Sequence, residues 1–244
     1  MSRPVALITG SARRIGAEIA RRLHRAGYDL ALHHRNSAEA MQALSAELQA
    51  TRANSVLCLQ AELGEFDRLP ELVASTLGRF GRLDALVNNA SAFYPTPLGA
   101  IQPSQWNELF ASNAWAPLFL IQAAAPHLAR QNGAIVNLVD IYAERPLKQH
   151  TVYCMAKAAL WSMTQSLAIE LGPDVRVNAV APGAVLWPDS GKAYTDQQKL
   201  IEATALKRCG NPQEVAEAVR WLLQDASYCT GQLIRVDGGR SLGW

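Results

Sequence analysis

Long apolar runs are missing from this sequence, and none comes close to the roughly 20 residues that a membrane-spanning helix needs. The first ten residues pass directly into a strand-like pattern and lack the apolar core of a secretion signal. A surplus of one charge is missing too, because 23 basic and 21 acidic residues are spread along the chain and leave a net charge of +2. We therefore expect a cytoplasmic protein that binds neither a membrane nor a nucleic acid.

Cysteine is scarce. Each of the four residues stands alone, with no Cys-x-x-Cys pair and no histidine at metal-ligand spacing. This pattern argues against a disulfide framework and against a zinc site, so we expect reduced thiols and no bound metal. The four are Cys58, Cys154, Cys209 and Cys229.

What the sequence does have is a regular alternation of short apolar runs with longer helical stretches. The runs are rich in Val, Ile, Leu and Ala without polar alternation, which is typical of strands buried on both faces of a parallel sheet. No linker, repeat or low-complexity tract interrupts the series. The pattern predicts one doubly wound α/β domain over residues 1–244, of Rossmann type, with about seven parallel strands and a ligand at their carboxyl ends. The runs span residues 5–9, 29–33, 55–60, 85–88, 134–139, 175–180 and 233–236.

The first run leads into the segment Thr-Gly-Ser-Ala-Arg-Arg-Ile-Gly at residues 9–16, after which a helix begins. Gly10 lets the chain turn tightly and brings backbone N–H groups toward a phosphate, and the helix N-terminus adds partial positive charge. Two glycines also occur in ordinary strand-to-helix turns, so the prediction of a dinucleotide site rests on their place in the chain as well. We expect the cofactor to be bordered by Gly10, Arg13, Arg14 and Ile15.

The end of the second run indicates which dinucleotide binds. A site for NAD places Asp or Glu there to hold the ribose hydroxyls, but this sequence has no carboxylate before Glu39. Arg14 and Arg35 instead supply guanidinium groups suited to the 2′-phosphate of NADPH, which an acid would repel. A basic loop tip without a ligand is the plainer alternative. The sequence favours NADPH, with its phosphate near Arg14, His34, Arg35, Asn36 and Ser37.

Tyr153 and Lys157 stand four residues apart in the predicted helix 152–171 and therefore share one face of it. A lysine cation near a phenol favours the phenolate, so we expect Lys157 to lower the pKa of Tyr153 and to make proton exchange feasible near neutrality. Many helices contain this spacing by chance. The pair gains weight because the first turn of the same chain indicates a dinucleotide site.

Asn113 lies in a predicted long helix over residues 105–130, four residues before Pro117. Proline has no N–H, so the carbonyl group of Asn113 loses its usual helix partner. A carbonyl freed in this way can hold a water molecule that continues a proton relay from Lys157. The alternative is a kinked surface helix with a solvated carbonyl.

These motifs, in this order, resemble those of the short-chain dehydrogenases/reductases over the whole chain. The turn at residues 9–16 is similar to the family's TGxxxGxG, with Arg14 where its middle glycine usually stands. Tyr153 and Lys157 match its Tyr-x-x-x-Lys motif, and the family carries an asparagine at the position of Asn113. The further cofactor contacts that the resemblance implies are Glu62, Leu63, Asn89, Ala90, Ser91, Tyr153, Lys157, Pro182 and Gly183.

Asp140 stands where most members of that family have a serine, at the end of the fifth strand. A serine hydroxyl suits a carbonyl oxygen. A carboxyl group suits a nitrogen heterocycle, either by accepting N–H bonds or by supplying a proton if burial raises its pKa. A role as a turn cap is the plainer alternative.

With the segment 88–98, the turn at residues 9–16, Asp140 and the segment 153–157, the chain resembles the pteridine reductase branch of the family. The resemblance implies a dihydropteridine ring stacked between the nicotinamide and Phe93. Hydride would pass to a C=N carbon and a proton to nitrogen, either through Tyr153 and Asp140 or from water. Dihydromonapterin, dihydrobiopterin and dihydrofolate are the candidate substrates. The implied substrate residues are Arg14, Ser91, Phe93, Asp140 and Tyr153.

Two other functions stay open. One is the reduction of a small ketone or a 3-oxoacyl substrate, against which Asp140 argues. The other is a nonenzymatic NADP(H)-binding regulator, although such proteins often lose part of the set Tyr153, Lys157 and Asn113, which is complete here.

Two further expectations follow from the family alone. One is a homotetramer whose dimer face is formed by helices 105–130 and 152–171. The other is a substrate-covering loop over residues 184–199, which contains Trp187, Pro188, Asp189 and Tyr194.

Overall fold

The computed structural model describes residues 3–185 and 197–243 and contains one seven-stranded sheet with the order β3-β2-β1-β4-β5-β6-β7. All neighbouring strands pair in parallel. The predicted doubly wound α/β fold is therefore confirmed. The strands are β1 (Val5–Ile8), β2 (Asp29–His34), β3 (Val56–Gln60), β4 (Ala85–Asn88), β5 (Ala134–Leu138), β6 (Arg176–Pro182) and β7 (Leu233–Val236).

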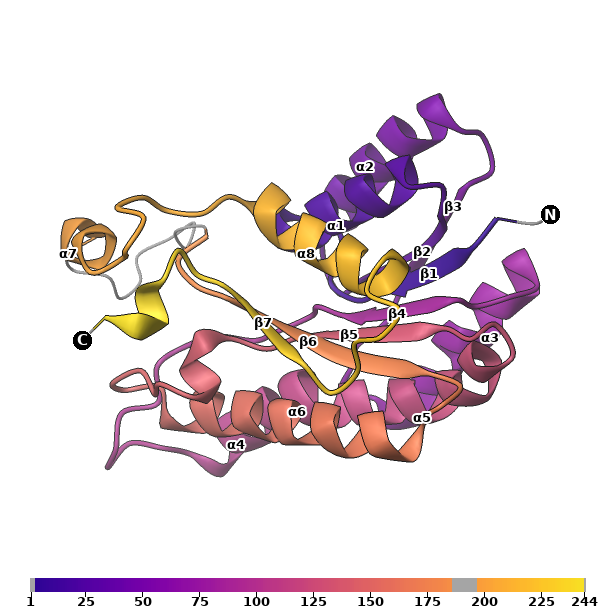
Figure 1. Cartoon of the computed structure of the whole chain (residues 1–244). Helices are drawn as coiled ribbons and strands as arrows, with labels where there is room; N and C mark the ends of the chain where they lie inside the picture. Colours follow the sequence, from indigo (N-terminus) through magenta and orange to yellow (C-terminus); the bar gives the residue numbers. More distant parts are fainter. Residues whose placement is uncertain (1–2, 186–196, 244) are drawn as a thin grey trace.

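Helices lie on both faces of the sheet, which gives three layers (Figure 1). One face carries α1 (Arg14–Arg25), α2 (Ala38–Thr51) and α8 (Pro212–Gln224), and α1 packs closely on α8. The other face carries α3 (Leu69–Phe80), α4 (Pro103–Phe110), α5 (Ala116–Ala129) and α6 (Thr151–Glu170).

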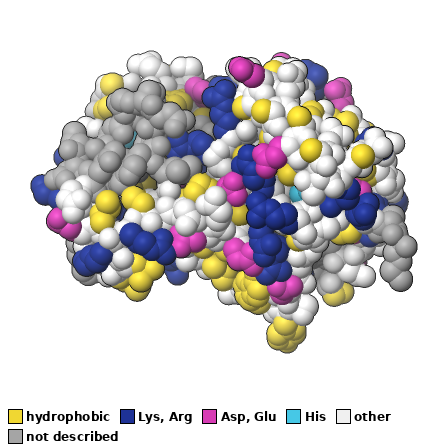
Figure 2. Space-filling model, turned by 90° about the horizontal axis from the view of Figure 1, so that it is seen from above, with side chains coloured by type: hydrophobic (Ala, Val, Ile, Leu, Met, Phe, Trp, Pro, Cys, Tyr) yellow, Lys and Arg dark blue, Asp and Glu magenta, His cyan; other side chains and the backbone are white. Residues whose placement is uncertain are grey.

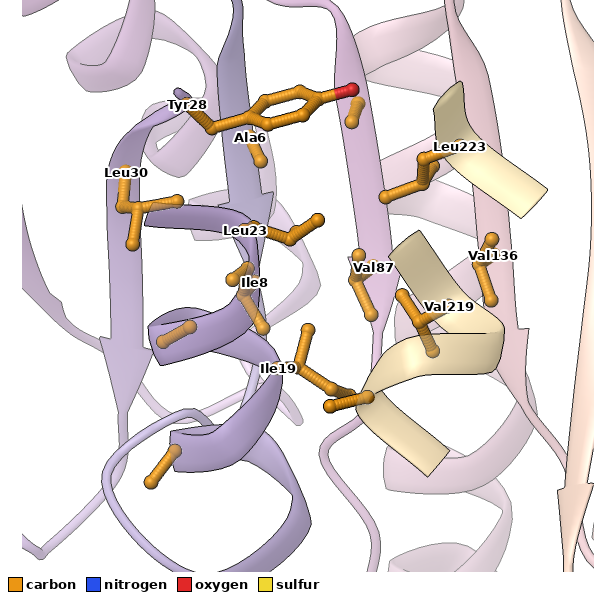
Figure 3. Packing of buried hydrophobic residues seen from close by; sticks show 14 of the residues in the cluster. Ala6, Ile8, Ile19, Leu23, Tyr28, Leu30, Val87, Val136, Val219 and Leu223 are labelled. Carbon is orange, nitrogen blue, oxygen red and sulfur yellow. The ribbon is translucent and has the colours of Figure 1, made fainter. Parts of the chain in front are cut away.

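The core consists of two apolar clusters, one on each face of the sheet. Side chains alternate along a strand, so Ile8 joins the cluster beneath α1 and α8 whereas Leu7 joins the cluster on the α3 and α5 side. Both are completely buried. Figure 3 shows Ile8 together with Ile19 of α1 and Val219 of α8. Burial on both faces explains why the strands read as continuous apolar runs.

The strand order reverses between β1 and β4, because β2 and β3 extend the sheet on one side of β1 and the later strands extend it on the other. The connections after β1 and β4 therefore leave in opposite directions and open a crevice at the carboxyl edge. The turn after β1 and residues 89–92 after β4 line this crevice. The fold thus creates a ligand site where the sequence predicted one.

The predicted helix 105–130 is not one uniform α-helix, and this corrects the expectation from its sequence. A π-helical segment, Ala111–Trp115, separates α4 from α5. Here the N–H of Ala116 donates to the carbonyl of Ala111, five residues earlier, and Pro117 has no N–H with which to restore the α-helical pattern. Asn113 lies inside this segment and is completely buried.

A short helix that the sequence pattern did not indicate, α7 (Gln197–Glu202), lies beside the C-terminal segment (Figure 1). The loop expected over residues 184–199 falls mainly on residues 186–196, which lie outside the described part of the chain. Trp187, Pro188, Asp189 and Tyr194 are among them, so the expected cover over the substrate stays a prediction.

The face formed by α1, α2 and α8 carries basic and acidic side chains next to one another (Figure 2). Ion pairs join α1 to α2, through Arg21 and Glu47 at 2.8 Å, and α1 to α8, through Arg22 and Glu217. Exposed pairs of this kind each stabilise a fold by about 0–1 kcal/mol.

Among residues 3–185 and 197–243, no helix combines the length and apolarity needed to cross a bilayer.

Candidate active site

Two adjoining cavities occupy the crevice at the carboxyl edge of the sheet. The larger, of about 480 Å³, runs from the turn after β1 to the ends of β2 and β3, and the smaller, of about 170 Å³, reaches α6. Both are lined by Arg14, Ile15, Asn89 and Ser91, so they form one continuous site. Every residue predicted to bind the cofactor lines one of the two cavities. Their contacts with a bound cofactor stay predictions.

The turn after β1 is packed too tightly for side chains at its glycines. Gly10 has φ +61°, and a Cβ atom on it would lie 2.8 Å from Cα of Ala90. A Cβ atom on Gly16 would lie 2.3 Å from the carbonyl oxygen of Gly10. The Asn89 side chain holds the turn in place by donating to the carbonyls of Thr9 and Gly10, each at 2.9 Å. Such a turn leaves its outer surface open to a phosphate group.

Arg14 adopts φ +54°, in the left-handed region, at the place where the short-chain dehydrogenases/reductases usually have glycine. A side chain costs roughly 1–2 kcal/mol in this conformation. The substitution therefore keeps the glycine backbone and adds a guanidinium group that faces both cavities.

The far end of the larger cavity suits a phosphate. His34 is 7% exposed, burial lowers its pKa, and its Nδ1 has no hydrogen-bond partner within the described residues. The guanidinium of Arg35 lies 3.5 Å from the Glu62 carboxylate, with both side chains about half exposed. The glycine cradle fits the pyrophosphate of a nicotinamide dinucleotide, and the recognition of a further phosphate at this end stays a prediction.

The chemical centre lies in the smaller cavity. The hydroxyl of Tyr153 donates a hydrogen bond to Oδ2 of Asp140 at 2.7 Å, and the N–H of Tyr142 donates to Oδ1 of Asp140 at 2.9 Å. Lys157 donates instead to the carbonyl of Leu138 at 2.7 Å. Tyr153 is 4% exposed and Lys157 2% exposed, so these groups are shielded from water.

Burial sets the protonation of this centre. It raises the pKa of Asp140, against the effect of the N–H of Tyr142, the Tyr153 hydroxyl and the Lys157 cation. It also lowers the pKa of Lys157 to about 8. Burial, reinforced by the Asp140 carboxylate, raises the pKa of Tyr153 well above 10. The expectation that Lys157 lowers the pKa of Tyr153 is therefore wrong for this state, because Asp140 contacts the hydroxyl and Lys157 does not.

The side chain of Asn113 forms a hydrogen bond with Ser91 and not with the ammonium group of Lys157. Its Oδ1 accepts a hydrogen bond from the Ser91 hydroxyl at 2.7 Å, and its Nδ2 donates to the carbonyls of Ala92 and Leu109. The side chain thereby fixes the segment after β4 against the π-helical turn. A relay through the carbonyl of Asn113 stays a prediction.

Phe93 lines neither cavity. Its ring stacks on His150 with centroids 4.8 Å apart and meets the Tyr153 ring edge-on at 4.8 Å. One face of Phe93 is therefore already covered by protein. Stacking of a substrate ring on Phe93 stays a prediction and requires its other face.

His33, which is not among the site residues predicted from the sequence, lines the larger cavity from β2. The residue is 1% exposed and bonds through its ring to the backbone of Gly10 and Ala61. A histidine inside an otherwise apolar run was the available signal, since a buried polar ring requires partners on both nitrogens.

Comparison with known proteins agrees with this geometry. A family model described as enoyl-(acyl carrier protein) reductase matches residues 10–241. Pteridine reductase 1 of Leishmania tarentolae is 38% identical over 98% of this chain and 96% of its own length. A granaticin polyketide synthase putative ketoacyl reductase of Streptomyces violaceoruber is 37% identical, with the same coverage. A 3-oxoacyl-acyl-carrier-protein reductase of Staphylococcus epidermidis is 34% identical over 96% of this chain and 97% of its own length.

These relatives cover nearly the whole chain. The resemblance stated from the motifs is confirmed at the level of the family. Crevice, glycine turn and Tyr153–Lys157 pair together identify the chain as a member of the short-chain dehydrogenases/reductases, oxidoreductases that use a nicotinamide dinucleotide.

Proposed function

We propose that this protein reduces a dihydropteridine with NADPH, at a C=N bond, to the tetrahydro form. The observation that carries the proposal is the buried hydrogen bond between Tyr153 and Asp140. It places a carboxyl group with a raised pKa beside the tyrosine, where a nitrogen heterocycle needs both an acceptor for N–H groups and a source of a proton.

NADPH supplies the hydride when it is bound. The first turn of α1, which follows the turn at Gly10, would hold its pyrophosphate, and Tyr153 and Lys157 would lie beside the reacting ring. The Tyr153 hydroxyl donates to Asp140 across 2.7 Å, so the two groups are placed together to orient the substrate nitrogen and to pass a proton to it. Direct proton delivery by water is the alternative route.

The preference for NADPH rests on the charge around the far end of the larger cavity. Arg14, His34 and Arg35 border it, and the only carboxylate among its described lining residues is Glu62, which already pairs with Arg35. Arg35→Ala should raise the KM for NADPH by about tenfold and leave the KM for NADH nearly unchanged, because one charge-assisted bond to the 2′-phosphate is lost. Equal effects on both cofactors would contradict recognition of the phosphate.

The proposed substrate lies next to Asp140 and Tyr153, with Ser91 and Arg14 at the junction of the two cavities. Phe93 lines neither cavity, so we propose that it stacks on the ring with the face that His150 leaves uncovered. Phe93→Ala should raise the KM for the pteridine by about tenfold and leave the affinity for NADPH unchanged, because ring stacking is worth about 0.5–1.5 kcal/mol beyond buried area. Equal weakening of both ligands would mean that Phe93 only supports the fold.

Reduction of a 3-oxoacyl substrate is the second candidate, and the ketoacyl and 3-oxoacyl reductases among the relatives favour it. Asp140 argues against it, since a carboxylate repels the oxyanion that forms when a ketone is reduced. A nonenzymatic regulator is disfavoured, because Asp140, Tyr153 and Lys157 line one cavity.

The deciding experiment mixes the purified protein with NADPH and either a dihydropteridine or a 3-oxoacyl thioester while the absorbance of the reduced nicotinamide is followed. We expect turnover of the dihydropteridine and little of the thioester. Tyr153→Phe should abolish turnover while NADPH binding persists. Asp140→Ser, which restores the usual serine of the family, should reduce pteridine turnover at least a hundredfold (~10²) and raise thioester turnover. Turnover of the thioester alone would exclude the proposed substrate.

We also propose that the protein forms a homotetramer. Large apolar side chains stand exposed on the sheet face that carries α5 and α6, at Trp115, Leu118, Phe119 and Ile169. Apolar surface grouped in this way supports association between copies. Leu118→Glu combined with Ile169→Glu should convert the tetramer into smaller species in light scattering, and an unchanged mass would reject this face as the interface.

A further inference from the structure

The side chain of His33 connects two walls of the larger cavity. Its Nδ1 accepts a hydrogen bond from the N–H of Gly10 at 3.2 Å, and its Nε2 lies 3.1 Å from the carbonyl oxygen of Ala61. Gly10 opens the turn after β1, and Ala61 directly follows β3. Since His33 itself stands on β2, one imidazole ties together the ends of three adjacent strands.

Only one protonation state of His33 satisfies both contacts. The N–H of Gly10 is a donor and needs a lone pair on Nδ1, whereas the carbonyl of Ala61 is an acceptor and needs a proton on Nε2. The neutral imidazole with its proton on Nε2 provides both. An imidazolium would turn an N–H toward the N–H of Gly10 and break that contact.

The surroundings of His33 favour the neutral ring. Burial is the main cause that lowers its pKa, and the hydrogen bond to the carbonyl of Ala61 works in the opposite direction. Of the charged or titratable neighbours, His34 on the same strand lowers the pKa further and Glu62 after β3 raises it. Burial prevails, so the ring keeps its neutral form at neutral pH.

The backbone of His33 holds the same turn. Its carbonyl oxygen accepts hydrogen bonds from the N–H of Ser11 at 2.9 Å and from the Ser11 hydroxyl at 3.2 Å. The N–H groups of Gly10 and Ser11 are therefore directed at His33 and not at a phosphate. Donors for the phosphate must come from the first turn of α1, where amides have no acceptor within a helix.

Gly10 is consequently held from two sides. Its N–H is fixed by His33, and its carbonyl accepts from the Asn89 side chain at 2.9 Å. These two contacts fix the two peptide units on either side of Gly10, and those units in turn place the start of α1. Loss of either contact changes where the phosphate donors point.

We propose that His33 is a positioning residue for the dinucleotide, and that its neutral imidazole holds the Gly10 turn and the Ala61 wall at the separation that the cofactor requires. It acts through Gly10 and Ala61 rather than through the reacting atoms. Cofactor affinity then depends on the protonation of His33. The inference rests on the dinucleotide site of the family and not on the identity of the substrate.

The test is a titration of binding, without substrate, followed by the fluorescence of the reduced nicotinamide. His33→Leu keeps the bulk of the ring but removes both hydrogen bonds, and His33→Asn offers an acceptor and a donor that do not titrate. Near pH 8 the leucine variant should raise the Kd for NADPH by about tenfold, because buried backbone groups lose their partners. The asparagine variant should weaken binding less.

The pH dependence separates positioning from mere support of the fold. Because burial lowers the pKa of His33 below 6.5, its neutral form prevails at neutral pH and is lost as the pH falls into the acid range. In the acid range in which the wild type loses affinity through protonation of His33, the ratio of the leucine variant's Kd to the wild-type Kd should therefore shrink toward one. The titration of the cofactor phosphate cancels in this ratio. The wild type should lose affinity for NADPH in acid as His33 takes up a proton. The asparagine variant should not show this loss, because its side chain does not titrate.

His24 provides the matched control. It is also buried, burial also lowers its pKa, and its Nε2 lies 2.8 Å from the Ser55 hydroxyl, but it lines neither cavity. His24→Leu should lower the melting temperature and leave the Kd for NADPH and its pH profile unchanged.

Two results would overturn the proposal. The first is a leucine variant that is folded by circular dichroism and binds NADPH as tightly as the wild type. The second is a Kd ratio that stays constant with pH. If the leucine variant does not fold, the asparagine variant provides the test. The proposal is contradicted if this variant loses affinity for NADPH in acid as the wild type does. A parallel titration with NADH keeps this test separate from the cofactor preference, and the omission of substrate keeps it separate from pteridine turnover.

Discussion

The hydroxyl of Tyr153 lies 2.7 Å from Oδ2 of Asp140, whereas Lys157, one helical turn further along α6, donates to the carbonyl of Leu138. Tyr153 and Lys157 share a helix face, but the hydrogen bond of the Tyr153 hydroxyl is made with Asp140. Asp140 raises the pKa of the phenol, and this effect adds to that of burial. The substitution of the family's usual serine by Asp140 thus changes the acid-base properties of the tyrosine itself.

Asp140→Asn should lower the pKa of Tyr153, because the negative charge that opposes ionisation of the phenol is removed while a hydrogen-bonding side chain remains. A spectrophotometric titration of the phenol, with Tyr153→Phe to identify its contribution, measures the change. Pteridine turnover should fall by about 10² or more, since the amide has no proton to share. A titration curve identical to that of the wild type would remove Asp140 from the electrostatics of Tyr153.

The reaction should lose rate as the pH rises through about 8. Burial lowers the pKa of Lys157 to about 8, so the ammonium is present below that pH and is lost above it. Its loss removes a cation and a hydrogen-bond donor from the floor of the smaller cavity. The dependence of kcat on pH at saturating substrate measures this limb. Lys157→Met should have a low kcat that does not fall further above about pH 8. A fall that persists in this variant must come from the titration of another group.

Arg14→Gly should separate binding from folding. Glycine relieves the positive φ of Arg14 but adds entropy to the unfolded chain, so the free energy of unfolding should change by less than about 1 kcal/mol. The Kd for NADPH should rise by about tenfold or more, because a guanidinium beside the phosphates is lost. Urea denaturation and a binding titration measure the two effects. A stability loss of several kcal/mol would mean that Arg14 mainly supports the fold.

Glu62→Gln should strengthen the binding of NADPH by up to about fivefold, because it frees Arg35 from a half-exposed ion pair of about 0.2–1 kcal/mol. The affinity for NADH, which has no 2′-phosphate, should stay nearly the same. Glu65→Gln is the control, since Glu65 pairs with Arg68 at 2.9 Å and does not line the larger cavity. Weaker binding of NADPH by the Glu62 variant would show that its carboxylate contacts the cofactor directly.

Thr164→Val should destabilise the protein by about 1–3 kcal/mol, because it leaves a buried polar group without its partner. Its hydroxyl accepts from Nδ2 of Asn137 at 2.9 Å, and Oδ1 of Asn137 accepts from Asn88 at 2.9 Å, so a polar chain links β4 and β5 to α6. Urea denaturation measures the loss, with the exposed Thr51→Val as the control. A change no larger than that of the control would show that the chain contributes little.

Much of this protein follows from local sequence. Strands buried on both faces must be apolar throughout, and this predicts the inner strands β1, β2, β4, β5 and β6. The edge strands β3 and β7 are only partly buried, and their place in the alternating series indicates them. The turn at Gly10 is only partly local, because its glycines lie close together in the chain but Asn89 and His33 hold it from other strands. The spacing of Tyr153 and Lys157 predicts that they share a helix face, and they do.

Tertiary structure decided what these parts contact. Asn113 bonds to Ser91 because a π-helical turn buries it, and His33 bonds to Gly10 and Ala61 because β2 lies between their strands. The pKa of Tyr153 is raised by burial and by Asp140, which lies 13 residues away in the chain. The spacing of residues in the sequence predicts which side chains are neighbours within one helix or strand. Electrostatic effects and buried hydrogen bonds instead depend on distance through space, and only the folded chain sets that distance.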